Sequence, residues 1–292
     1  MPADARLDAR AVGLAVLAMA IVGTSYTAAK LALHDLPVFG TLLLRNLVTV
    51  ATLGGYALWA GARLAASGRA TRFILAQTGF FLLNQTLLFA GLAMTSAGRA
   101  AILFNMQPFF TLLLLPLFVP AERLTLRRWL GTGVAFLGVA LVLAERGTAG
   151  GSLLGDALVL LGALGWTGNV ILNKTMPREV SPVAVIFWNA AGAVAVFGIL
   201  SLAFEPEAAW NFSAAAFASV LYMGMITASL GFVLFVWLTN SYSASRVNVF
   251  VFLSPVFGVL TGWAVLGEPI TLIQALGAVG VAGGILVVST ES

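Results

Sequence analysis

The chain has 292 residues, of which 60% are hydrophobic and only 9% are charged, with a mean hydropathy of +1.02. A soluble domain carries about 25% charged residues, so this chain is predicted to be an integral membrane protein. With no cysteine and one histidine, disulfides and Cys- or His-based metal clusters are excluded, and we expect neither a metal nor a cofactor. The net charge is +4. Because the basic residues lie in short segments between apolar runs, we expect no nucleic-acid partner.

A helix needs about 20 apolar residues to cross a bilayer. Ten runs of about that length predict ten transmembrane helices, at roughly 11–29, 37–60, 73–94, 98–119, 127–144, 153–173, 182–203, 213–238, 246–266 and 270–289. Arg6 and Arg10 precede the first run, as in a signal peptide. The run is long, however, and has no small-x-small cleavage site before Lys30, so we interpret it as a retained helix.

The chain repeats itself at half its length. The segment from Arg99 to Pro108 resembles the segment from Arg246 to Pro255. Both the arginines and the prolines are 147 residues apart. A period this long indicates a duplicated domain rather than a solenoid. We therefore expect two five-helix repeats, residues 1–148 and 149–292.

The basic residues predict the orientation. With a cytoplasmic N-terminus, the inside segments hold Arg6, Arg10, Arg63, Arg69, Arg72, Arg123, Arg127, Arg128, Lys174, Arg178 and Arg246, and the outside segments hold Lys30, Arg99 and Arg146. This bias places both termini in the cytoplasm. Because five is odd, the second repeat must enter the membrane from the opposite side. Duplication can simply enlarge a membrane protein, but inverted repeats provide two mirror-related conformations of similar energy and so favour transport by alternating access.

Several segments together carry a family resemblance. They are Gly23 to Lys30, Phe39 to Arg45, Trp166 to Lys174, and the stretches from Pro108 to Glu122 and from Pro255 to Glu268. As a set they resemble the ten-helix EamA-type carriers of the drug/metabolite transporter (DMT) superfamily. More narrowly, the chain resembles bacterial aromatic amino-acid exporters of the YddG type. The resemblance implies a multi-pass carrier, and the scarcity of Lys and Cys indicates a bacterial inner membrane.

Polar side chains within the predicted helices are the candidates for binding. Such residues are costly in lipid and should face the interior or a watery cavity. The candidate substrate-binding residues are Trp166, Asn169, Asn173, Gln77, Phe80, Phe81, Asn84, Tyr222, Met225, Ser229 and Asn105. Together they would hold a flat apolar ring by aromatic contact and a polar head by amides. Alternatively, each amide could tie two helices together.

Charged residues refine the prediction. Arg45 lies well inside the second predicted helix and Lys30 lies near an outer end, so either could bind a substrate carboxylate. A snorkelling or inter-helix structural role is the alternative for each. The carboxylates lie in loops or at helix ends of the predicted spans, whereas proton-coupled carriers generally use an intramembrane Asp, Glu or His. We therefore hypothesise facilitated diffusion or exchange.

Pro108 and Pro255 occupy matched positions in the two repeats, where each removes a backbone hydrogen bond and bends its helix. We predict that they act as paired hinges; static kinks that widen a cavity are the alternative. Gly280 and Gly284 form a GxxxG pattern that could pair protomers, although packing within the chain is its more frequent use. We expect a monomer or a weak dimer.

The sequence therefore predicts a secondary transporter that exports small amino acids or metabolites, with aromatic amino acids as the favoured substrates. An exporter of other metabolites or drug-like compounds is the alternative within the same class. An intramembrane lipid-processing enzyme is the alternative from another class. It would need a His, Glu or Asp cluster at bilayer depth.

Overall fold

The computed structural model describes residues 8–61, 64, 68–118, 125–145, 152–173, 181–242, 247 and 249–289. The regular structure in these ranges is entirely helical. The elements are α1 (Ala9–Asp35), α2 (Val38–Ala60), α3 (Arg69–Met94), α4 (Ala97–Phe104), α5 (Gln107–Phe118), α6 (Leu126–Ala144), α7 (Leu153–Asn173), α8 (Pro182–Phe204), α9 (Ala214–Leu221), η1 (Tyr222–Gly231), α10 (Phe232–Ser241), η2 (Val249–Phe252), α12 (Leu253–Leu266) and α13 (Leu272–Ser289). Glu122, Lys174 and Arg246, which belong to the repeated segments, lie outside the described residues.

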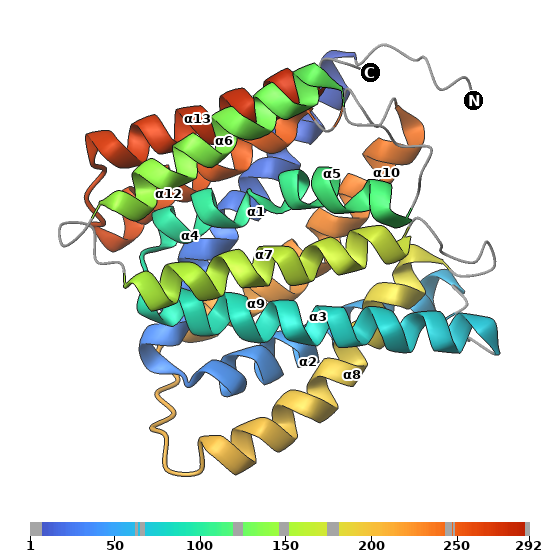
Figure 1. The fold of residues 1–292 in the computed structure, drawn as a ribbon. Helices are drawn as coiled ribbons and strands as arrows, with labels where there is room; N and C mark the ends of the chain where they lie inside the picture. Colours follow the sequence, from blue (N-terminus) through green and yellow to red (C-terminus); the bar gives the residue numbers. More distant parts are fainter. Residues whose placement is uncertain are drawn as a thin grey trace.

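These elements form ten spans, which confirms the predicted number. α4 and α5 make one span, α9, η1 and α10 make another, and η2 and α12 make a third. Seven of the spans are by themselves long and apolar enough to cross a membrane, and shorter apolar helices make up the rest. The first turn of α1 and the last turn of α13 lie at the same end of the bundle (Figure 1).

The two halves of the chain pack against each other through matched helices. α2 packs on α8 and α6 packs on α13, and in each case the partners hold equivalent places in the two repeats. The contact of α3 with α7 corresponds in the same way to that of α1 with α9. The neighbouring pairs α6/α13 and α3/α7 are visible as side-by-side ribbons in Figure 1. The core is therefore built mainly from contacts between repeats, not within them.

Glycines allow the helices to approach closely at these crossings. A Cβ atom on Gly284 of α13 would lie 2.5 Å from the backbone oxygen of Gly131 in α6. A Cβ on Gly258 of α12 would lie 2.3 Å from the Cβ of Ala101. Small residues at interfaces are the usual basis of helix packing in lipid. The Gly280–Gly284 pattern thus packs within the chain.

One end of the bundle carries most of the described carboxylates, several of which bridge the two halves. Glu268 accepts hydrogen bonds from the backbone N–H groups of Ala97 and Gly98 at the start of α4, at 2.7 and 3.0 Å. Glu205 does the same for Phe39 and Gly40 in the first turn of α2, at 2.9 and 3.0 Å. Negative charge is favourable at a helix N-terminus. Each carboxylate therefore caps a helix of the opposite repeat.

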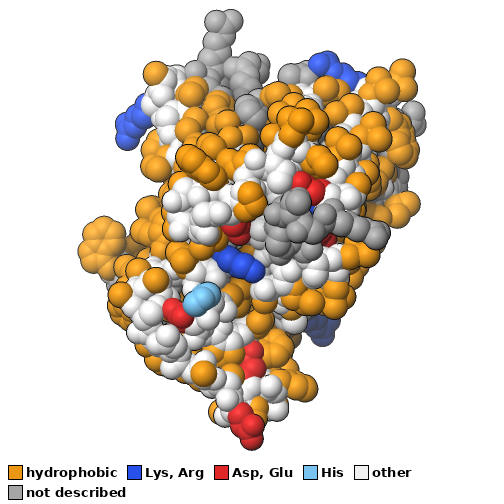
Figure 2. Space-filling model, turned by 90° about the vertical axis from the view of Figure 1, so that its left-hand side faces the viewer, with side chains coloured by type: hydrophobic (Ala, Val, Ile, Leu, Met, Phe, Trp, Pro, Cys, Tyr) orange, Lys and Arg blue, Asp and Glu red, His pale blue; other side chains and the backbone are white. Residues whose placement is uncertain are grey.

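Two further carboxylates at this end make similar bridges. Asp35 accepts a hydrogen bond from the hydroxyl of Ser213. Asp156 pairs with Arg99, and the two side chains are only 1% and 2% exposed. We call this end the outer end, after the orientation predicted from the basic residues. Figure 2 looks onto it and shows acidic side chains near the single histidine. The two halves are thus held together at the outer end by carboxylates.

Candidate functional site

A cavity of about 330 Å³ lies between the two halves. Its lining residues come from α1, α2, α3, α4, α5, α7, α8, η1, α10, η2 and α12, and so from both repeats. Helices α6 and α13 contribute no lining residue and pack on each other to one side. The cavity therefore sits at the interface of the repeats, where inverted-repeat proteins place their ligands.

Helix interruptions shape the cavity wall at matched positions. The span formed by α4 and α5 breaks at Asn105–Met106, just before Pro108, and in the second repeat the 3₁₀ turn η2 precedes Pro255. Proline has no N–H to donate to the preceding turn, so it weakens or interrupts the hydrogen bonding of the helix at that point. Phe104 and Gln107, beside the first break, line the cavity. Val251 and Ser254, the residues 147 positions later in the second repeat, line it as well.

A π-helical segment forms another part of the wall. Over Tyr222–Gly231 the helix widens, and the hydroxyl of Ser229 donates to the carbonyl of Gly224 five residues earlier, at 2.8 Å. Met223, Thr227 and Gly231 from this segment line the cavity. Widened turns of this kind are frequent at functional sites.

Many of the residues predicted from the sequence line the cavity. They are Arg45, Gln77, Phe81, Asn84, Asn105, Trp166, Asn169 and Asn173. The α3 and α7 residues among them recur every three or four positions, so each set lies on a single face of its helix. The structure brings these two faces together.

The other predicted residues lie away from the cavity. Phe80 is offset from Phe81 by about 100° around α3, packs against Gly168 and is 39% exposed on its outer side. Met225 is 44% exposed. The hydroxyl of Tyr222 contacts that of Thr24 and donates to the carbonyl of Ile21.

The remaining two, Ser229 and Lys30, bond to backbone carbonyls. Ser229 bonds within its own helix, as described above. The Nζ of Lys30 donates to the carbonyls of Leu92 and Thr95, both at 2.8 Å, and to that of Ala93 at 3.2 Å. It thus caps the C-terminal end of α3, where positive charge is favourable.

The structure adds cavity residues that the sequence analysis did not single out. The polar ones include Asn46, Thr49, Asn189, Thr227 and Ser254, and the aromatic ones include Phe89 and Phe232. The rule that polar residues within a span face inward would have found Asn189 in the apolar helix α8. The hydroxyls gave no such signal, because Ser and Thr can bond to their own helix backbone anywhere in a span.

The amides of the cavity both line it and connect helices. Gln77 donates through Nε2 to the backbone oxygen of Asn169 at 3.1 Å and to Oδ1 of Asn173 at 2.9 Å. Asn84 donates through Nδ2 to the carbonyl of Gly162 at 2.8 Å. These bonds tie α3 to α7. The Oδ1 of Asn84 remains able to accept a hydrogen bond from a ligand.

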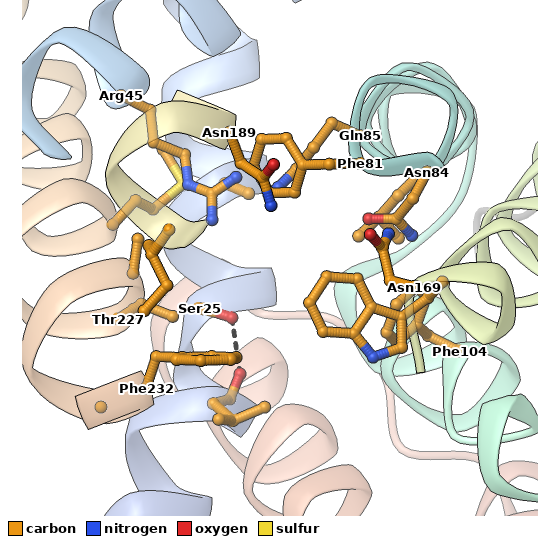
Figure 3. Close-up of a pocket in the computed structure, with 18 of the residues that line it drawn as sticks. Ser25, Arg45, Phe81, Asn84, Gln85, Phe104, Asn169, Asn189, Thr227 and Phe232 are labelled. Carbon is orange, nitrogen blue, oxygen red and sulfur yellow. Dashed lines mark hydrogen bonds between the residues drawn. The ribbon is translucent and has the colours of Figure 1, made fainter. Parts of the chain in front are cut away.

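Arg45 is the one charged side chain among the described residues that line the cavity. It lies about 10 Å along α2 from the outer end of that helix, and its guanidinium carbon is 5.6 Å from the centroid of the Phe89 ring. Its Nη1 is buried without a hydrogen-bond partner, and so are the hydroxyl oxygens of Thr227 and Ser254. Figure 3 shows Arg45 and Asn189 pointing into the space that Asn84 and Asn169 face from the other side. Unpaired buried polar groups are costly, so these atoms indicate a place for a ligand.

Two inverted bundles of five spans around a central polar and aromatic cavity define a membrane carrier. The chain belongs to the EamA-like transporter family, whose sequence pattern it matches twice, over residues 9–144 and 153–290. The two matches correspond to the two repeats. The protein is therefore a multi-pass membrane transporter of a small-molecule substrate and not an enzyme, which removes the lipid-processing alternative.

Individual relatives agree with this assignment. A probable amino-acid metabolite efflux pump of Salmonella typhimurium is 30% identical over 201 residues, covering 65% of this chain and 67% of that protein. The uncharacterized transporter YetK of Bacillus subtilis is 26% identical over 283 residues, covering 92% of this chain and 84% of that protein. A solved crystal structure superimposes with a TM-score of 0.69 at 17% identity, covering 97% of this chain and 99% of that chain, and shows that the fold is shared.

Proposed function

We propose that this protein exports aromatic amino acids or closely related amino-acid metabolites across a bacterial inner membrane, with both termini in the cytoplasm. The observation that carries the proposal is the cavity between the repeats, which combines aromatic side chains with a guanidinium and several amides. An aromatic ring would pack against the apolar surfaces, and polar groups would fix its orientation. The narrower resemblance to aromatic amino-acid exporters of the YddG type agrees with this composition.

The size and lining of the cavity support a single small solute. Its volume of about 330 Å³ lies at the lower end of the range for small-molecule sites. Aromatic rings are distributed around it, contributed by Phe81, Phe89, Phe104, Trp166 and Phe232. A flat solute would thus meet an aromatic side chain on more than one side.

The relatives named as probable amino-acid metabolite efflux pumps favour solutes derived from amino acids. Export of other metabolites remains the second candidate within the same class. Drug-like cations fit less well, because the described lining residues include Arg45 and no Asp or Glu. A positive ligand would meet a positive charge in a medium of low dielectric constant.

Alternating access would proceed by rearrangement of one repeat against the other. The carboxylate bridges hold the two repeats together at the outer end, so separating the repeats there requires Glu205 and Glu268 to release the helices they cap. Pro108 and Pro255, which lie beside the breaks in the two equivalent spans, are placed to act as paired hinges. The described cavity lining contains no Asp, Glu or His, which supports facilitated diffusion or exchange over proton coupling.

Counterflow in liposomes that contain only the purified protein tests the proposal. Labelled phenylalanine or tryptophan should accumulate against unlabelled internal substrate without an ion gradient. Trp166→Ala should lose most of this uptake, because Trp166 lines the cavity. Trp129→Ala is the matched control, since Trp129 lies on α6 and is 53% exposed on the outside of the bundle.

The outcomes separate the parts of the proposal. Counterflow with a different metabolite and none with aromatic amino acids would keep the carrier and discard the aromatic substrate. Uphill accumulation driven by a pH gradient alone would overturn the uncoupled mechanism. Equal losses of uptake in Trp166→Ala and Trp129→Ala would show that Trp166 does not bind the substrate.

A further inference from the structure

The positive charge of Arg45 inside the cavity favours one class of substrate over others. Arg45 forms none of the ion pairs among the described residues, and its Nη1 has no hydrogen-bond partner. The described lining offers no carboxylate that could neutralise it. An arginine cannot lose its proton under physiological conditions. Among the described residues, the cavity therefore holds one positive charge at membrane depth and no carboxylate to compensate it.

Neutral donors surround this charge. The hydroxyl of Thr227 is buried and unpartnered. Asn189 accepts a hydrogen bond from Thr78 through Oδ1 at 2.9 Å, which leaves its Nδ2 as a donor. In Figure 3 Arg45 and Asn189 both point toward the central space, with Thr227 on the same side of it. A guanidinium flanked by an amide N–H and a hydroxyl is a suitable site for a carboxylate.

A substrate ammonium group would find weaker partners. On the opposite side, Asn84 uses its nitrogen to bond Gly162 and leaves Oδ1 as an acceptor. Asn105 likewise uses Nδ2 for the carbonyl of Ala101, at 2.7 Å. Amide oxygens can hold a polar group but supply no negative charge. A bound zwitterion would thus leave the net charge of Arg45 uncompensated, whereas a bound anion would cancel it.

We propose, on the basis of the carrier function proposed above, that the preferred substrate is an organic carboxylate of net negative charge, bound by Arg45, Asn189 and Thr227. Neutralisation favours the closed, substrate-filled state, because an uncompensated charge is expensive in a dry site within the bilayer. Each turnover then carries one negative charge outward. A membrane potential of 100 mV, negative inside, would drive such an anion outward by about 50-fold at equilibrium. The potential therefore supplies a driving force for export without a coupling ion.

Three probes with the same phenyl ring test this inference in liposomes containing the purified protein. They are phenylpyruvate, an anion; phenylalanine, a zwitterion; and 2-phenylethylamine, a cation. The flux of phenylpyruvate should exceed that of phenylethylamine by at least about tenfold, with phenylalanine between them. A potassium diffusion potential that is negative inside should accelerate efflux of phenylpyruvate and leave that of phenylalanine unchanged. Liposomes without protein give the leak to be subtracted.

Variants of Arg45 connect the selectivity to the structure. Arg45→Gln should lower phenylpyruvate flux about tenfold or more and remove the preference for the anion over the zwitterion, whereas Arg45→Lys should retain the preference. Arg10→Gln is the control, because Arg10 is an exposed residue at the start of α1. A circular dichroism spectrum and a thermal midpoint like those of the unmodified protein show that Arg45→Gln is folded.

The possible results distinguish this inference from the proposed carrier function. If phenylalanine and phenylpyruvate move equally well, and the potential affects neither, the anion preference is wrong and the carrier stands. If no aromatic solute moves, the proposed aromatic substrates are wrong. Thermal-shift titration with phenylpyruvate then decides the inference. Stabilisation that Arg45→Gln abolishes would uphold the anion site, and its absence in the unmodified protein would overturn it.

Discussion

The carboxylate of Glu268 offers a direct test of how the outer end is closed. It belongs to the turn between α12 and α13 in the second repeat and caps α4 in the first, through the N–H groups of Ala97 and Gly98. Opening the outer end by separating the repeats must break both bonds. We predict that Glu268→Gln shifts the protein toward the outward-open state.

The size of the shift follows from the interactions that the substitution removes. A hydrogen bond to a charged group contributes about 1.5–3 kcal/mol, and a negative charge at a helix N-terminus adds about 0.3–1 kcal/mol. Glutamine keeps one acceptor oxygen, so it removes one bond and the charge. Because Glu268 is partly exposed to solvent, solvent screening lowers the sum of these two contributions, and we expect about 1.5–2 kcal/mol. This corresponds to a roughly 10- to 30-fold change in the opening equilibrium.

The absence of cysteine from the sequence makes the assay simple. Ala29 lines the cavity and is 3% exposed, and a cysteine in its place would be the only thiol in the protein. A membrane-impermeant thiol reagent applied from outside should react slowly with Ala29→Cys alone. In the background of Glu268→Gln, the labelling rate should rise by the same 10- to 30-fold.

A matched control separates gating from a general change of surface charge. Glu207 lies at the same end of the bundle and is exposed, so Glu207→Gln should leave the labelling rate unchanged. An unaltered rate in Glu268→Gln, with normal folding, would refute the idea that this bridge holds the outer end closed. A rise of similar size in both variants would refute it as well.

Three further variants probe packing, the proposed hinge and the buried ion pair. Gly284→Ala should lower the thermal midpoint in detergent by the equivalent of about 1–3 kcal/mol, whereas Gly283→Ala, where an added Cβ meets nothing within 4 Å, should not. Equal midpoints would contradict the close α6/α13 contact. Pro108→Ala should slow counterflow, because it lets the broken span join into one stiffer helix; an unchanged rate would remove the hinge. Asp156→Asn should reduce the yield of folded protein and cost about 3 kcal/mol, because it removes the nearer of the two carboxylates that face Arg99; an unchanged midpoint would mean that this pair does not stabilise the fold.

Hydropathy and the internal repeat were sufficient to predict the architecture. In lipid every backbone group must be bonded within its own segment, so long apolar runs can only become helices, and their number follows from counting them. The ten predicted spans agree with the structure, although Pro108 divides one of them more sharply than the apolar pattern suggested. The odd number of spans in each repeat was by itself enough to require the inversion.

The binding candidates were predicted less evenly. The polar residues on one face of α3 and of α7 were predicted because an amide in an apolar helix must meet another polar group or water. Gln77, Asn84 and Asn169 do line the cavity. Phe80 and Met225, by contrast, lie on outer faces of their helices. Hydropathy cannot separate a lipid-facing aromatic or methionine from a cavity-facing one, since both are apolar.

The sequence alone thus determined the membrane, the number of spans, the duplication and the embedded arginine, because these depend on local composition and spacing. Only the tertiary structure decided that Lys30 caps α3 while Arg45 reaches the cavity without a partner. The same holds for the carboxylates that bridge the repeats, whose partners lie as many as 178 residues away in the chain. Such pairings depend on which helix faces meet, and that is settled by the packing of small residues at crossings between the two halves, not by any local pattern.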